Sequence, residues 1–233
     1  MSKNKFYEIK IDRSLRRNSV SLSVSNNILF IKAPSYVSDK EIENIIDNKK
    51  NWINRKLLED GLLRKKCLVN YNNGDLFLYK GKQYELKINE SIKDNVFLSE
   101  KYLYVNTSDL YPGKEIIRKN ILSWYHDKSK YHIIKIASYY KVLMNISIND
   151  IKISDYKSKW GSCNKYKNLA FNWRIILAPE GVIKYLVVHE LSHVTYPNHS
   201  SKFWKNVEYF MPDYQHNRNW LRKNSRYLLM QCI

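Results

Sequence analysis

The feature that most constrains this chain is a pair of histidines four residues apart, His189 and His193, with Glu190 directly after the first. The preceding residues 182–188 are mostly apolar, which predicts a buried helix that begins after Pro179. Residues four apart on a helix lie on nearly the same face, so both imidazoles can bind one cation. Glu190 is placed to take a proton from a water rather than to bind the metal. The pattern therefore predicts a metal site.

A third histidine follows the expected end of this helix. Pro197 disfavours helical backbone at Tyr196, so we expect the chain to leave the helix there and fold back. His199 comes two residues later and is the expected third ligand. Glu208, on the next expected helix, is the alternative third ligand, and a capping role for His199 also stays open. Zinc suits three histidines and one open position, although other divalent transition metals do too.

Several further motifs carry a resemblance to one protein family. They are residues 157–163 (KSKWGSC), 172–174 (NWR), 187–193 (VVHELSH), 198–200 (NHS), 203–204 (FW) and 211–214 (MPDY). With these motifs the chain resembles the YgjP-like metallopeptidases, and a looser likeness extends through the N-terminal half. The resemblance implies a zincin-type fold, a zinc ion bound by His189, His193 and His199, and Glu190 as the catalytic residue. The chain is also similar to SprT and WLM peptidases, some of which act near DNA.

The predicted function is zinc-dependent hydrolysis of peptide bonds through a metal-activated water, with Glu190 as general base and then general acid. Candidate donors of a hydrogen bond to the oxyanion are Tyr196, Tyr214 and His216. A strand predicted at residues 169–176 could bind an extended peptide along an exposed edge. A metal-dependent amidase for a small substrate is one alternative, and a closed pocket without a free strand edge would favour it.

The net charge supports a second alternative. The chain has 40 Lys and Arg against 22 Asp and Glu, a formal net charge of +18. This charge would suit a nucleic-acid-associated protein with a structural metal, or a protease that acts on DNA-bound proteins. The lysines are dispersed, which favours a merely solvated basic surface, but Arg218, Arg222 and Arg226 form a stripe on a helix predicted at residues 213–230. Peptide or protein substrates are the expected partners, with nucleic acid as the alternative.

The sequence also bears on the cellular compartment. No segment is long and apolar enough to span a membrane, and the first residues lack the apolar run of a secretory signal. A cytoplasmic location is therefore expected. Three cysteines without CxxC spacing, Cys67, Cys163 and Cys232, predict neither a disulfide framework nor a cysteine zinc site.

The overall pattern predicts an α+β fold. An N-terminal antiparallel strand-and-helix region is expected over residues 1–110 and a zincin-like metallopeptidase domain over residues 111–233, and the two could form one continuous unit. In the first region we expect a hairpin that turns at Asn26-Asn27, a helix that begins after Ser38 and stops at Gly61, and an antiparallel sheet within residues 67–106. A long helix at 112–144 and a strand at 148–154 complete the prediction.

Overall fold

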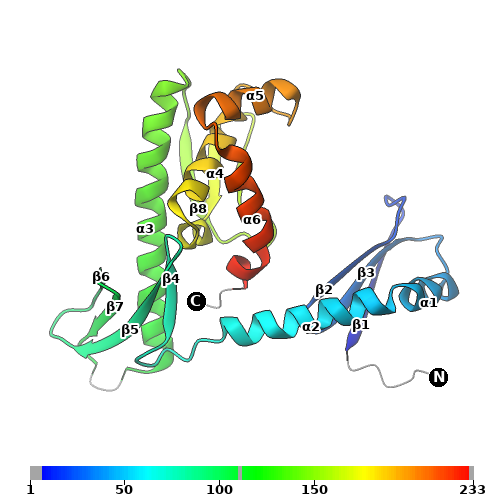
Figure 1. The fold of residues 1–233 in the computed structure, drawn as a ribbon, viewed down its shortest axis with the longest axis horizontal. Helices are drawn as coiled ribbons and strands as arrows, with labels where there is room; N and C mark the ends of the chain where they lie inside the picture. Colours follow the sequence, from blue (N-terminus) through cyan, green and yellow to red (C-terminus); the bar gives the residue numbers. More distant parts are fainter. Residues whose placement is uncertain (1–6, 110–111, 231–233) are drawn as a thin grey trace. The chain divides into compact units, whose positions relative to one another are not determined.

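The computed structural model describes residues 7–109 and 112–230. The chain divides into two compact units, Met1–Leu68 and Val69–Ile233. Each unit has its own core of buried apolar side chains, and each combines helices with a small sheet or sheets (Figure 1). The predicted α+β fold class is confirmed.

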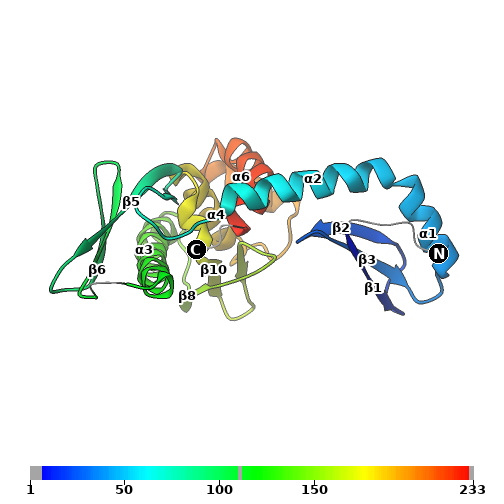
Figure 2. The same ribbon diagram turned by 90° about the horizontal axis from the view of Figure 1, so that it is seen from below.

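The first unit has a three-stranded sheet in one layer and two helices in the other (Figure 2). Its elements are β1 (Glu8–Ser14), β2 (Ser21–Ser25), β3 (Ile28–Pro34), α1 (Asp39–Asn48) and α2 (Lys50–Cys67). Asn26 and Asn27 have φ angles of 53° and 58°, the conformation of a tight hairpin turn, so the predicted hairpin is confirmed. Leu29 and Ile31 of β3 share the core with Ile53 of α2.

The helix predicted up to Gly61 is in fact two helices. The Ser38 side chain accepts the backbone N–H of Glu41, and the Glu41 side chain accepts that of Ser38, so the expected capping box begins α1. The predicted stop at Gly61 is wrong, because α2 continues to Cys67. Asp60 is fully buried there and accepts a hydrogen bond from the Asn27 N–H at 3.1 Å, which holds α2 to the hairpin. It also forms an ion pair with Arg64, one turn later in the same helix.

The first sheet of the second unit is mixed. Its strands are β4 (Leu76–Tyr79), β5 (Lys82–Glu90), β6 (Asn95–Ser99) and β7 (Tyr102–Thr107), in the order β4-β5-β7-β6. The prediction of antiparallel sheets is wrong for two pairs, since β5 and β7 are parallel and so are β1 and β3. In each sheet the second strand of a hairpin also pairs with a strand earlier in the chain. Such pairing between distant segments leaves no local sequence signal.

This sheet shares its core with the C-terminal half of the chain. Phe77, Leu86 and Leu103 lie in the same cluster as Ile121 of the long helix α3 (Lys114–Leu143). The Tyr125 hydroxyl donates to the Leu78 carbonyl at 2.5 Å. The compact units therefore divide at residues 68 and 69 rather than at residue 110, where the sequence analysis divides the domains.

A second sheet and three helices complete the unit. They are β8 (Asp150–Ser154), β9 (Gly161–Cys163), β10 (Asn168–Asn172), a 3-10 helix η1 (Trp173–Leu177), α4 (Glu180–Ser192), α5 (Ser201–Phe210) and α6 (Tyr214–Leu229). The strand predicted at residues 169–176 ends at Asn172, whose side chain accepts the Arg174 N–H and begins η1. The sheet order is β8-β10-β9, so β10 is central and the predicted edge at this strand is wrong. The short strand β9 is an edge instead.

Helix α4 lies at the centre of this unit and contacts α3, α5, α6, η1 and β9 (Figure 1). Nine of its 13 residues are buried, as its apolar sequence predicts. Among the helices described, none combines the length and apolarity that a membrane crossing requires. Cys67 is buried and Cys163 is half-buried, and Cys232 lies outside the described residues.

Candidate metal centre

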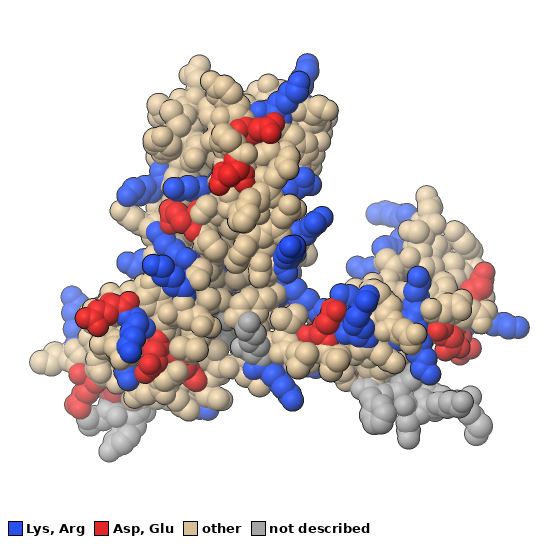
Figure 3. Space-filling model, viewed as in Figure 1, with Lys and Arg blue, Asp and Glu red and all other residues tan. Residues whose placement is uncertain are grey.

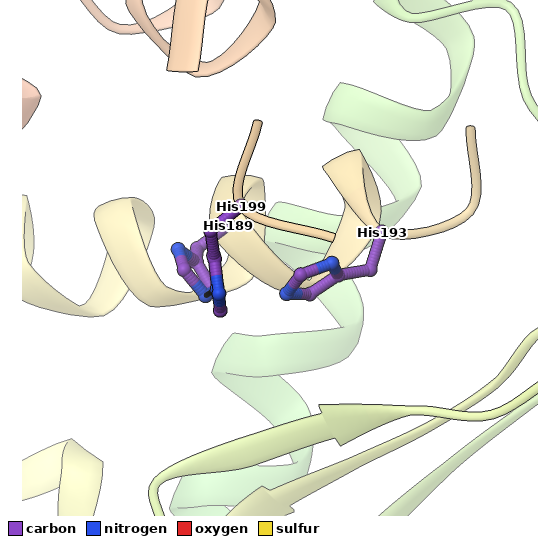
Figure 4. Close-up of side chains that lie close together, drawn as sticks. All are labelled: His189, His193 and His199. Atoms are coloured by element: carbon purple, nitrogen blue, oxygen red, sulfur yellow. Dashed lines mark hydrogen bonds between the residues drawn. The ribbon is translucent and has the colours of Figure 1, made fainter. Parts of the chain in front are cut away.

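Three histidine rings converge at the end of α4 (Figure 4). His189 lies in the last turn of α4, His193 is its C-cap residue, and His199 lies between α4 and α5. The distances between ring centroids are 5.0 Å for His189–His193, 5.0 Å for His189–His199 and 4.8 Å for His193–His199. One potential ligand atom from each ring lies within 4.8 Å of the others. The predicted break before Pro197 brings the third ring back to the first two.

The Nδ1 atoms of His193 and His189 contact neighbouring groups, whereas Nε2 of His189 and Nε2 of His199 face each other. His193 Nδ1 lies 3.0 Å from the Tyr196 carbonyl, which can only accept, so Nδ1 carries the proton. His189 Nδ1 lies 3.5 Å from the Tyr185 hydroxyl, one helical turn earlier. His189 Nε2 and His199 Nε2 are 3.1 Å apart, close to the spacing of about 3.3 Å that two nitrogens have in a tetrahedral zinc site. The donor set therefore fits a divalent metal ion.

Two aromatic side chains of helix α5, Phe203 and Trp204, pack against the histidine rings. The Phe203 ring is fully buried, and its centroid lies 5.0 Å from that of His189, 4.5 Å from His193 and 4.9 Å from His199. Trp204 stacks on His199, with centroids 5.6 Å apart and an interplanar angle of 19°. These apolar contacts hold the imidazoles in one geometry and limit water on that side.

Burial favours the neutral, metal-binding form of His189 and His193. Desolvation is the largest cause that lowers the pKa of His189 to about 3, and the charges of His193, His199 and Arg218 act in the same direction. Desolvation also lowers the pKa of His193; the Tyr196 carbonyl opposes this effect and the His199 charge adds to it. These two imidazoles can therefore bind a cation at neutral pH without first losing a proton.

Glu190 directly follows His189 in α4, and its side chain is buried against the backbone of β9. Its side chain is 4% exposed, and a Cβ added to Gly161 would lie 2.4 Å from its Oε1 atom. Desolvation raises the pKa of this carboxyl group to about 8, and the Lys159 charge opposes the shift only in part. A carboxyl group that favours its protonated form is a strong proton acceptor once ionised, and a bound cation would favour its ionised form.

The other predicted site residues lie in different surroundings. The carbonyl of Tyr196 orients His193, whereas Tyr214 is buried and stacks on Trp204, with centroids 5.5 Å apart. His216 and Glu208 are exposed, and neither belongs to the group of possible ligands found among residues 7–109 and 112–230. The structure thus brings His199 to the first two histidines, and not the alternative ligand Glu208.

Two residues of the site, Tyr185 and Gly161, were not predicted from the sequence. Tyr185 precedes His189 by one helical turn, and this spacing is a signal that could have identified it. Gly161 is close to Glu190 only through the pairing of β9 with β10 and the packing of α4, so no local pattern reveals its role.

A comparison with known protein families identifies the family of this chain. Residues 18–224 match the model of the YgjP-like metallopeptidase domain. Among solved structures, the chain is similar to the metallopeptidase zymogen of Pyrococcus abyssi abylysin, with a TM-score of 0.36 and 20% identity over 39% of this chain and 93% of that chain. No curated protein sequence matches. The family match covers most of the chain, which confirms the resemblance drawn from the sequence, and the chain belongs to the YgjP-like metallopeptidase family.

Proposed function

We propose that this chain is a zinc-dependent peptidase in which His189, His193 and His199 bind the metal and Glu190 is the general base. The observation that carries the proposal is the convergence of three imidazoles at the end of the helix that also carries the buried carboxyl group of Glu190, the residue after His189. Membership of a metallopeptidase family supports a metal-dependent peptidase, and the three-nitrogen donor set supports zinc in particular.

Each step of the proposed peptide hydrolysis is assigned to a particular group. A bound divalent cation would supply Lewis acidity toward the peptide carbonyl and lower the pKa of the attacking water. Glu190 would accept the proton of that water and later donate it to the leaving amine. Its burial against Gly161 fixes the carboxyl group in one position. Tyr196, Tyr214 and His216 stay predictions as oxyanion donors.

The edge strand β9 favours a peptide over a small substrate. In the described sheet β9 pairs with β10 on one side only, and its first residue contacts Glu190. An extended peptide could therefore form main-chain hydrogen bonds beside the carboxyl group. A closed pocket without a free strand edge would favour an amidase for a small substrate, so the open edge of β9 disfavours that alternative.

Replacement of Glu190 by Gln tests the proposal. The variant should bind one equivalent of zinc like the wild type but hydrolyse an unfolded protein substrate about 10²–10⁴-fold more slowly, because it lacks the proton acceptor. Glu208→Gln changes the same charge at an exposed position and should leave the rate unchanged. A Glu190→Gln variant with wild-type activity would contradict the assigned role.

Nucleic-acid binding stays a prediction, and so does a cytoplasmic location. On the face drawn in Figure 3, Lys and Arg side chains are scattered and interleaved with acidic ones. Binding of DNA with a steep dependence on salt, together with an absence of peptide hydrolysis by zinc-loaded protein, would favour the nucleic-acid alternative.

A further inference from the structure

Two cations, Arg218 and Lys159, lie next to the candidate metal centre. The Arg218 guanidinium of α6 lies 4.2 Å from the centroid of Trp204, the ring that stacks on His199. Lys159, just before β9, has its Nζ 3.2 Å from the Ser162 hydroxyl, and Ser162 follows Gly161 in that strand. Across the part of the chain that the structure describes, neither cation forms an ion pair.

Both cations adjoin residues that contact the site. Arg218 lies over Trp204, which stacks on His199. Lys159 comes two residues before Gly161, which packs against Glu190. Both side chains are exposed, so a ligand in the site can reach them.

A positive charge beside a divalent-cation site has a cost. Like charges repel, and the repulsion weakens metal binding unless an anion lies near both. A few other cations of this unit have carboxylate partners: Lys80 pairs with Glu180 at 2.9 Å, and Arg174 pairs with Asp155. The absence of such partners at Arg218 and Lys159 leaves two positions where an incoming anion would be stabilised.

We propose that Arg218 and Lys159 bind carboxylates of the substrate, so that the enzyme prefers peptides with acidic residues next to the scissile bond. This inference rests on the proposed peptidase function. The ring of Trp204 holds the guanidinium of Arg218 in a defined orientation, and a guanidinium can bind a carboxylate through two parallel hydrogen bonds. Lys159 would act as a point charge at the β9 edge.

The experiment uses the full-length, zinc-loaded chain and fluorescence-quenched peptides of one sequence that carry Glu, Gln or Lys on both sides of the scissile bond. We expect kcat/KM for the Glu peptide to exceed that for the Gln peptide by about tenfold or more, because charge-assisted hydrogen bonds contribute about 1.5–3 kcal/mol each. Arg218→Gln and Lys159→Gln should each lower this ratio, and Arg218→Lys should retain part of it.

Two matched variants separate local recognition from net charge. Arg222→Gln removes a positive charge one turn after Arg218 in α6. Lys157→Gln removes a positive charge two residues before Lys159, and both positions are exposed. Each should keep the wild-type ratio. Equal cleavage of the Glu and Gln peptides by the wild type, or an equal loss of preference in the matched variants, would overturn the proposal.

A binding measurement separates this inference from the peptidase function itself. If no peptide is cleaved, the proposed peptidase function is wrong. Fluorescence anisotropy with the same zinc-loaded protein still tests whether Arg218 and Lys159 bind carboxylates of a peptide. Tighter binding of the Glu peptide than of the Gln peptide, lost in Arg218→Gln, supports the inference. Equal binding of the two peptides overturns the inference, as does binding of single-stranded DNA that depends on Arg218 when the Glu peptide does not bind.

Discussion

At the scale of single residues, the contact between Gly161 and Glu190 is the most specific feature of the site. A Cβ at position 161 would lie 2.7 Å from both Cγ and Cδ of Glu190, and the buried glutamate has little room to move. Gly161→Ala should therefore displace the carboxyl group and lower kcat/KM about 10²-fold, the usual effect of a misplacement near 1 Å, while zinc binding stays unchanged. Wild-type kinetics in this variant would show that the contact is not needed.

A second residue-scale prediction concerns pH in the metal-free protein. Glu190 has a pKa of about 8 when folded against 4.5 ordinarily, so between these values the folded state holds a proton that the unfolded state has released. Its contribution to the free energy of unfolding falls as pH rises, by at most about 1.4 kcal/mol per pH unit. His189, with a folded pKa of about 3 against 6.5, acts in the opposite sense below pH 6.5.

Urea denaturation of the metal-free protein between about pH 6.5 and pH 8 isolates the effect of Glu190. Wild-type stability should decrease across this window relative to Glu190→Gln, which has no such group. Parallel stability curves for the two proteins would contradict the burial of an uncompensated carboxyl group.

At the scale of elements, Gly61 of α2 can be tested by mutation, because it was wrongly predicted to end the helix. Gly61 lies inside the helix, and an added Cβ would meet no atom within 4 Å. Gly61→Ala should therefore raise the free energy of unfolding of the first unit by about 0.5–1 kcal/mol, because alanine restricts the unfolded chain and favours helix. Chemical denaturation measures this change, and a destabilised variant would show an unrecognised steric conflict. Peptidase activity should not change, which makes this variant a control for Gly161→Ala.

Local signals predicted most of the elements, and pairing between distant segments was the part they missed. The capping box at Ser38 and the turn at Asn26-Asn27 act within a few residues, so the sequence shows them directly. The parallel pairs β1–β3 and β5–β7 and the central position of β10 depend on contacts between remote segments. The strand predicted through Ile176 ended early because the Asn172 side chain caps η1, a choice that β-propensity does not reveal.

The same contrast between local signals and distant contacts applies to the candidate site. His189, Glu190 and His193 share one helix, and the break before Pro197 directed His199 toward them, so spacing alone indicated the group. The residues around it come from β9, α5 and α6, and their roles arise from tertiary packing.

At the scale of the whole molecule, two separate cores predict two unfolding events. The candidate metal ligands all belong to the unit Val69–Ile233. Zinc should therefore raise the midpoint of one calorimetric transition only, by about 5–10 °C at a free concentration 100 times the dissociation constant. The other transition should keep its midpoint. A single transition, or equal shifts of both, would show that the units unfold together.

The central claim is that three imidazoles bind one divalent ion, and X-ray absorption at the zinc edge tests it most directly. Protein loaded with one equivalent of zinc should show three imidazole nitrogens and one further light ligand at about 2.0–2.1 Å. His199→Ala should show one imidazole fewer. Sulfur at about 2.3 Å, or a spectrum that His199→Ala leaves unchanged, would contradict the account.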